Sequence, residues 1–354
     1  MEIVEQLPAS KSSFSKAIKG ERMEWIDYAK GLAIILVVYR HSLVGINRSG
    51  IHVPEFLYDI QEFVLNFRMP VFFMLSGLFL DKAIRKCTPT ALIRQKSNTL
   101  LYPYLFWAVV FITIQILLSS YTNSVRTYRD YAFILTQPRN LDHMWYLLAL
   151  FNTNMLFILV SPYLLNKTIT HIVFAVVLHL LAYVVRDYSI ISDLFYHYIF
   201  LMLGVMFSEK LFAQKEKSKG NMWQLLAITP LFVVGQLIWL KMRPGTFQTQ
   251  LLFLLVILVA CGFFYMLCRA LYAYNILRGL SFIGKYSLYI YILHLLVISS
   301  FRMFSIHFLH LTNVYFIVFA GLILGVGLPI IIYRAGKKFG IDLLFSLEPK
   351  KTLI

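Results

Sequence analysis

Long apolar runs recur through this chain from Ile26 to Tyr333, and most are close to the roughly 20 residues that a helix needs to cross a bilayer. Because hydrocarbon offers no partner for backbone polar groups, such runs must form helices or closed barrels, and runs of this length indicate helices. We therefore predict an all-α polytopic integral membrane protein with about ten transmembrane helices. The expected spans are residues 26–46, 61–80, 99–120, 145–165, 169–186, 194–209, 223–240, 249–269, 281–303 and 313–333.

The composition supports one membrane domain rather than a soluble domain with an anchor. Hydrophobic residues make up 59% of the chain and charged residues 14%, whereas a soluble domain carries about 25% charge. We expect a polar cytoplasmic tail over residues 1–25, a membrane domain over 26–335 and a basic cytoplasmic tail over 336–354. The cysteines Cys87, Cys261 and Cys268 have neither metal-site spacing nor a disulfide pattern, so no metal is expected.

The distribution of Lys and Arg predicts the orientation in the membrane. With the N-terminus placed in the cytoplasm, 21 of the 33 basic residues fall in cytoplasmic segments and 8 in external ones, while four lie within the spans. This excess favours cytoplasmic N- and C-termini by the positive-inside rule. It also accounts for the net charge of +16 without nucleic acid, and makes membrane lipids the expected surroundings.

Two ionisable residues of the first span form the leading candidate for a catalytic pair. Lys30 and His41 are eleven residues apart, which is almost three helical turns, so both lie on one face about 16 Å apart along the axis. A cation near the cytoplasm is suited to an anionic donor, and an imidazole deeper in the span to taking a proton from a hydroxyl. The alternatives are that Lys30 snorkels to lipid headgroups and that His41 makes a structural hydrogen bond.

Polar residues in two other spans are expected to support this pair. Arg68 falls in the outer half of the second span, with Ser76 in its inner half, where a small residue also serves helix packing. In the ninth span Lys285 lies near the inner end. His294, nine residues further on, is predicted near the depth of His41. Buried hydrogen bonding is the alternative role for His294.

Residues at the span ends are candidate contacts for the two substrates. His143 and Trp145 open the fourth span at the outer interface, where His143 is placed to contact an acceptor and Trp145 is a common interfacial residue. Arg94 belongs to a basic cluster from Lys82 to Lys96 at the cytoplasmic face. That cluster is suited to coenzyme phosphates or to lipid headgroups.

At these residues the chain resembles the acyltransferase-3 family of bacterial membrane O-acyltransferases, over about residues 24 to 335, and within it the fucose 4-O-acetylase-like branch. Each motif is weak alone, but together and in this order they are fairly specific. The motifs are Asp27-Tyr28-Ala29-Lys30-Gly31-Leu32-Ala33 with His41; Arg68-Met69-Pro70-Val71-Phe72-Phe73-Met74-Leu75-Ser76-Gly77; Arg94, Tyr102-Pro103-Tyr104 and His143-Met144-Trp145-Tyr146-Leu147; and Gly284-Lys285-Tyr286-Ser287-Leu288-Tyr289-Ile290-Tyr291-Ile292-Leu293-His294.

The resemblance implies a membrane O-acetyltransferase in the bacterial inner membrane, with residues 26–335 as its acyltransferase domain. Acetyl-CoA is the implied cytoplasmic donor, and the implied acceptor is a sugar hydroxyl of a surface glycan or glycolipid precursor. It also implies essential roles for Lys30 and His41, with Lys30 and Arg94 as coenzyme contacts. Lys30 departs from the Arg of many members, which weakens a bidentate grip on phosphate but keeps a point charge.

A secondary transporter or glycolipid flippase is the alternative from another functional class, because it too would use buried His, Lys and Arg. Such a transporter is expected to show paired repeats with interrupted helices, and the sequence shows no convincing internal repeat. The sequence also leaves open a longer acyl donor and a homodimer.

Overall fold

The computed structural model describes residues 23–119, 126–164, 167–213, 221–242 and 247–347, and every regular element in these ranges is helical. Residues 1–22 of the predicted N-terminal tail and 348–354 of the predicted C-terminal tail lie outside them. The helices are α2 (Glu24–Arg48), α3 (Glu55–Phe63), α4 (Leu65–Lys86), α5 (Pro89–Lys96), η1 (Ser97–Leu101), α6 (Tyr102–Leu117), η2 (Tyr128–Ala132), α7 (Phe133–Thr136), η3 (Pro138–Leu141), α8 (Trp145–Leu164), α9 (Thr168–Val184), α10 (Ser189–Ala213), α11 (Asn221–Met242), α12 (Phe247–Ala273), α13 (Gly279–Lys285), α14 (Ser287–His307), α15 (Val314–Lys338) and η4 (Asp342–Leu344).

The prediction of an all-α polytopic membrane protein is confirmed. Within the described ranges, nine helices are long and apolar enough to cross a membrane, and each coincides with a predicted span. The remaining predicted span, 169–186, corresponds to α9, which is also apolar but has 17 residues. It ends at Val184, just before the charged pair Arg186 and Asp187, because these side chains would be costly inside hydrocarbon.

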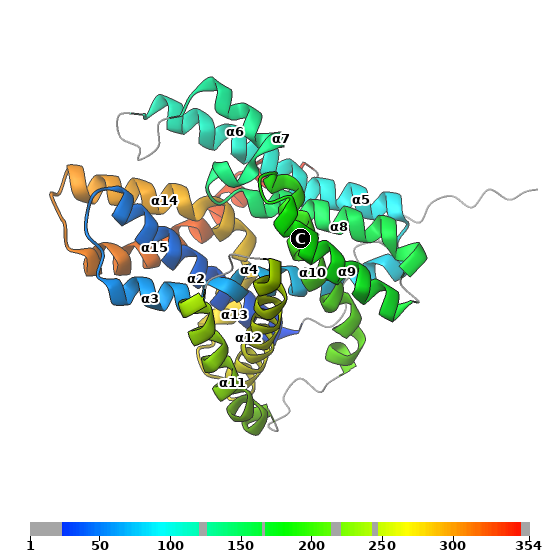
Figure 1. The fold of residues 1–354 in the computed structure, drawn as a ribbon. Coiled ribbons are helices and arrows are strands. Elements are labelled where there is room, and N and C mark those ends of the chain that lie inside the picture. The colour runs from blue at the N-terminus through cyan, green and yellow to red at the C-terminus, as the bar shows by residue number, and fades with distance from the viewer. Residues whose placement is uncertain (1–22, 120–125, 165–166, 214–220, 243–246, 348–354) are drawn as a thin grey trace, which may run out of the picture.

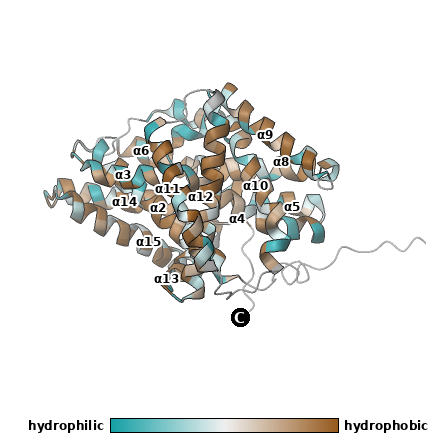
Figure 2. Ribbon diagram, turned by 60° about the horizontal axis from the view of Figure 1, so that its bottom comes forward, coloured by the Kyte–Doolittle hydropathy of each residue, from teal (hydrophilic) through white to brown (hydrophobic). Residues whose placement is uncertain are grey.

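The first long helix, α2, organises the bundle. It packs against α14 and α15 on one flank and contacts α12, α13 and α4 elsewhere, while α4 packs against α10 and α11 pairs with α12 (Figure 1). The long helices are brown along most of their length in Figure 2, as expected for surfaces that face lipid or the packed interior.

Glycines allow the closest helix contacts. Gly77 of α4 and Gly204 of α10 each lie against the backbone of the other helix, with no room for a Cβ atom. Gly31 of α2 and Gly284 of α13 make a similar contact. Small residues at such crossings let helices gain dispersion energy where lipid removes the hydrophobic driving force. These contacts fix the position of α2, which carries Lys30 and His41, and of α4, which carries Arg68.

The segment after α15 docks back onto the middle of the chain. The Tyr102 hydroxyl donates a hydrogen bond to the Leu343 carbonyl oxygen at 2.8 Å, and the Trp107 indole donates one to the Leu344 carbonyl oxygen at 2.7 Å. Phe345 is buried against Trp107 at a ring-centroid distance of 6.1 Å. Part of the predicted C-terminal tail is thus integrated into the helical bundle.

Candidate active site

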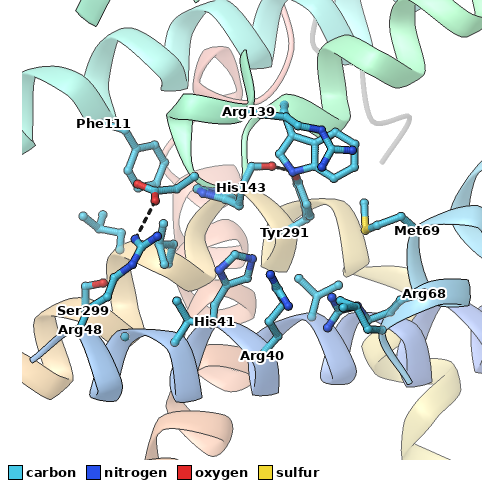
Figure 3. A pocket seen from close by; sticks show the side chains of 18 of the residues that line it. Arg40, His41, Arg48, Arg68, Met69, Phe111, Arg139, His143, Tyr291 and Ser299 are labelled. Carbon is cyan, nitrogen blue, oxygen red and sulfur yellow. Dashed lines mark hydrogen bonds and ion pairs between the residues drawn. The ribbon is translucent and has the colours of Figure 1, made fainter. Parts of the chain in front are cut away.

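A cavity of about 560 Å³ opens at the end of the bundle where His41 lies, which we call the His41 end. Its lining comes from α2, α4, α6, α10, α11 and α14, and from the segment around η3 that leads into α8. Arg40 and His41 rise from α2 into the cavity, and Arg139 and His143 enter from the opposite side (Figure 3). The volume lies within the range of about 300–1,000 Å³ that is usual for small-molecule sites.

Three histidines from separate parts of the sequence meet beside this cavity. The ring centroid of His41 lies 5.2 Å from that of His294 and 6.1 Å from that of His143, and the last two are 4.9 Å apart. His41 and His143 line the cavity, and His294 is fully buried behind them. The structure therefore places His294 not only near the depth of His41 but in contact distance of it.

Backbone carbonyls determine which nitrogens of the two supporting histidines carry hydrogen. His294 Nδ1 donates to the carbonyl oxygen of Tyr291 at 2.7 Å, and His143 Nε2 donates to that of Ile292 at 3.2 Å. Because a carbonyl oxygen only accepts, His294 Nε2 and His143 Nδ1 carry the lone pairs when the rings are neutral. Both of these nitrogens are buried without a hydrogen-bond partner, so each is available to accept a proton or a hydrogen bond.

The η3 segment positions His143. Asp142 has a positive φ of 54°, which turns the chain sharply between η3 and α8. The Tyr291 hydroxyl donates a hydrogen bond to the His143 carbonyl oxygen and so ties this turn to α14. His143 is 2% exposed. Its ring is therefore held from two sides, by Tyr291 through the backbone and by Ile292 through Nε2.

Arg68 enters the cavity wall from α4 with part of its guanidinium unsatisfied. Its Nη1 donates to the Leu36 carbonyl oxygen of α2 at 2.9 Å, whereas its Nε has no partner. The side chain is 4% exposed and lines the cavity. A buried cation with free donor capacity is suited to negative charge that develops during a reaction.

Trp145 also lines the cavity, where it forms a platform for a cation. The Arg139 guanidinium lies 4.3 Å from the Trp145 ring centroid and donates to Asp193 Oδ1 from Nε at 2.7 Å. Trp145 is thus more than an interfacial residue of the fourth span.

The other predicted site residues do not line this cavity. Lys30 is near the opposite end of α2, which we call the Lys30 end, with its Nζ 5.0 Å from the Phe79 ring centroid. Ser76 is half-buried on α4, next to the close contact of Gly77 with α10. Lys285 is exposed at the end of α13, and Arg94 is exposed on α5.

The sequence interpretation missed several residues of the cavity. Arg40, Arg48, Arg139 and Arg302 are not among the site residues that the sequence predicts. All four line the cavity. Their positions in the sequence were the one indication that they belong to the site. Each lies near the external end of a predicted span, close to the predicted depth of His41.

Within the described ranges, no group of three or more His, Cys, Asp or Glu side chains has an arrangement that could hold a metal ion.

A family model described as an acyltransferase domain, Acyl_transf_3, matches residues 23–334. The chain belongs to the acyltransferase-3 family. The match runs from the start of α2 into α15 and so includes every helix that lines the cavity. No curated protein and no solved structure matches the chain. The family match disfavours the transporter alternative, and the long apolar helices are those of a multi-pass membrane protein.

Proposed function

We propose that this acyltransferase transfers an acetyl group from acetyl-CoA to a sugar hydroxyl of a surface glycan or its precursor, with His41 as the general base. The observation that supports this most is the placement of His41. Its ring lines a cavity large enough for a ligand. Beside it lie the rings of His294 and His143, whose Nε2 and Nδ1 atoms are buried without a hydrogen-bond partner. An imidazole in these surroundings is suited to accept a hydroxyl proton.

In the proposed reaction the acceptor hydroxyl gives its proton to His41 while its oxygen attacks the thioester carbonyl carbon. The tetrahedral intermediate then collapses with cleavage of the carbon–sulfur bond. The departing thiolate takes the proton from the imidazolium, which returns His41 to its neutral form and releases CoA. No other reactant is needed.

Arg68 is the best supported candidate to stabilise the oxyanion of that intermediate. It lines the same cavity as His41 and has an unpaired Nε. Donors aimed at developing charge in a water-poor site contribute strongly to acyl transfer. Ser76 and Lys285 were also expected to support the catalytic pair, but both lie outside the cavity lining and lack this support.

We place the coenzyme at the Lys30 end. Lys30 and Arg94 supply positive charge there, and Lys96 lies close enough to Lys30 for the two charges to repel. Anionic phosphates would relieve that repulsion. The excess of basic residues on this side supports a cytoplasmic Lys30 end with both termini inside. The bacterial inner membrane is the location that the resemblance to bacterial O-acyltransferases implies. The acceptor would then enter the cavity at the external face.

The test is turnover of acetyl-labelled acetyl-CoA by the purified protein in detergent. His41→Ala should lower acetyl transfer and hydrolysis by at least about 100-fold, because general-base catalysis contributes on the order of 10²–10⁴. His52→Ala is the matched control, since His52 is exposed and does not line the cavity. Full activity of His41→Ala would refute the base assignment, and a wild-type protein that neither binds nor hydrolyses acetyl-CoA would refute the proposed function.

A further inference from the structure

The cavity around His41 has more positive charge in its lining than the proposed acetyl-transfer step uses, since that step assigns a role to Arg68 alone. Five arginines line it, and Asp142 is the one acidic residue among the described residues of the lining. The arginines come from four segments that are distant in the sequence, since α2 supplies two and α4, η3 and α14 supply one each. The lining arginines are Arg40, Arg48, Arg68, Arg139 and Arg302.

Two of these cations are already paired. Arg48 Nη1 lies 3.1 Å from Asp142 Oδ1, and Arg139 Nη2 lies 2.5 Å from Asp193 Oδ1. For Arg40, Arg68 and Arg302, no ion pair with a carboxylate occurs within the described part of the chain. The positive charge of the cavity is therefore only partly compensated.

The cations are close enough to repel one another. Electrostatic repulsion acts on Arg40 from Arg48 and Arg139, on Arg68 from Arg40, and on Arg302 from Arg48. Glu62 is near enough to attract both Arg40 and Arg68, and it offsets part of this. Gathering several guanidinium groups around one partly desolvated space costs free energy unless an anion occupies it.

Arg302 is held in place by a feature of the backbone. Its guanidinium lies against Gly45 of α2, in the space that a Cβ atom at position 45 would need. Gly45 and Arg302 both line the cavity. The missing side chain at Gly45 therefore creates the seat that keeps an unpaired guanidinium at the cavity wall.

We propose that this cavity binds an acceptor that carries phosphate next to the sugar, such as a glycosyl phosphate or diphosphate. This inference rests on the proposed function and names its acceptor class. Guanidinium groups match phosphate oxygens with bidentate geometry. The surplus of unpaired arginines fits the multiple charges of a phosphate or diphosphate better than a single carboxylate. Aromatic lining residues, Trp145 and Tyr196 among them, provide apolar surface for the sugar.

Inorganic diphosphate is the direct probe, because its binding does not depend on the identity of the sugar. Titration into the purified full-length protein, followed by calorimetry, should show binding. Arg302→Gln should weaken it about tenfold or more, as expected for loss of a charge-assisted hydrogen bond. Gly45→Ala keeps every charge but displaces the guanidinium, and should weaken binding in the same direction. Arg186→Gln is the matched control, since Arg186 is exposed and lies outside the cavity lining.

Competition experiments with CoA and with phosphatidylglycerol distinguish an acceptor phosphate from the phosphates of the coenzyme and of lipid headgroups. Binding that persists with saturating CoA and with phosphatidylglycerol supports an acceptor site. Displacement by CoA would assign the arginines to the coenzyme, and displacement by phosphatidylglycerol would assign them to lipid headgroups; either result overturns the proposal. Absent binding in the wild type, or equal binding by Arg302→Gln and wild type, also overturns it. Acetyl-CoA hydrolysis by the same preparations reports on the proposed function separately.

Discussion

Replacing His294 with phenylalanine tests whether the histidine cluster assists the proposed base. His294 Nε2 is an unpaired acceptor beside His41, whose ring centroid is 5.2 Å away. His41 takes the acceptor proton on the ring nitrogen that faces the hydroxyl. The N–H on its other ring nitrogen then becomes a charged donor, from which His294 Nε2 can accept a hydrogen bond. Phenylalanine keeps a planar ring, somewhat larger than the imidazole, but has no lone pair, so it removes the acceptor; the control variant below carries the same increase in volume.

The expected loss follows from the interaction that disappears. A hydrogen bond to a charged group contributes about 1.5–3 kcal/mol, and the imidazolium exists in the transition state but not in the resting enzyme. Its removal should therefore lower kcat by about 10- to 100-fold, at about 1.4 kcal/mol for each factor of ten. The KM for acetyl-CoA should not change, because His294 lies at the His41 end, away from Lys30. The fold should also persist, since the carbonyl oxygens of Ile290 and Tyr291 that accept from His294 Nδ1 can still accept helical N–H bonds.

The assay is steady-state turnover of labelled acetyl-CoA in detergent, with thermal unfolding measured on the same samples. His171→Phe is the matched control, because His171 is a buried histidine that bonds the Tyr198 hydroxyl at 2.8 Å and does not line the cavity. A His294→Phe protein with wild-type kcat and an unchanged melting temperature would show that the cluster does not assist His41. An equal fall in kcat for both variants would indicate a general packing effect.

Two further predictions concern the proposed coenzyme site at Lys30 and the packing of α4 against α10. Lys30→Gln should raise the KM for acetyl-CoA with little effect on the melting temperature. The control Lys337→Gln, at an exposed position, should leave the KM unchanged. Equal KM values for the two variants would contradict a coenzyme role for Lys30. Gly77→Ala should destabilise the protein by about 1–3 kcal/mol, because its Cβ would meet the backbone of α10 rather than a side chain that could move. Gly327→Ala, with open space around it, should be neutral in thermal unfolding, and similar melting temperatures for both alanine variants would contradict the packing argument.

The spans were predictable from the sequence because hydrocarbon imposes a length on every helix that crosses it. The α2 pattern also indicated that Lys30 and His41 share a face, since helical periodicity fixes angular position along one element. The fifth and sixth spans were the hardest to place, because Arg186, Asp187 and Asp193 lie between two short apolar runs. The structure has a helix of 17 residues, α9, at the fifth span and a helix of 25 residues, α10, at the sixth.

The composition of the site was only partly predictable. The depths of His41 and His294 followed from counting residues, but their approach to 5.2 Å depends on how α2 packs against α14. The arginine lining was missed for the same reason. A residue near a span end faces lipid, water or a cavity according to helix rotation and the course of connecting segments such as η3. Single-sequence patterns do not encode that rotation, so Arg139 and Arg302 resembled ordinary external charges.

The docking of the C-terminal segment has a consequence for biosynthesis. Trp107 and Tyr102 donate their side-chain hydrogen bonds to carbonyl groups that are 237 and 241 residues further along the chain. While the ribosome is still making α10 or α12, those partners do not yet exist. The side chains of Tyr102 and Trp107 must therefore have other surroundings until Leu343 and Leu344 have been made. The segment that holds Leu343 and Leu344 then forms its contacts with a helix that was made more than 200 residues earlier.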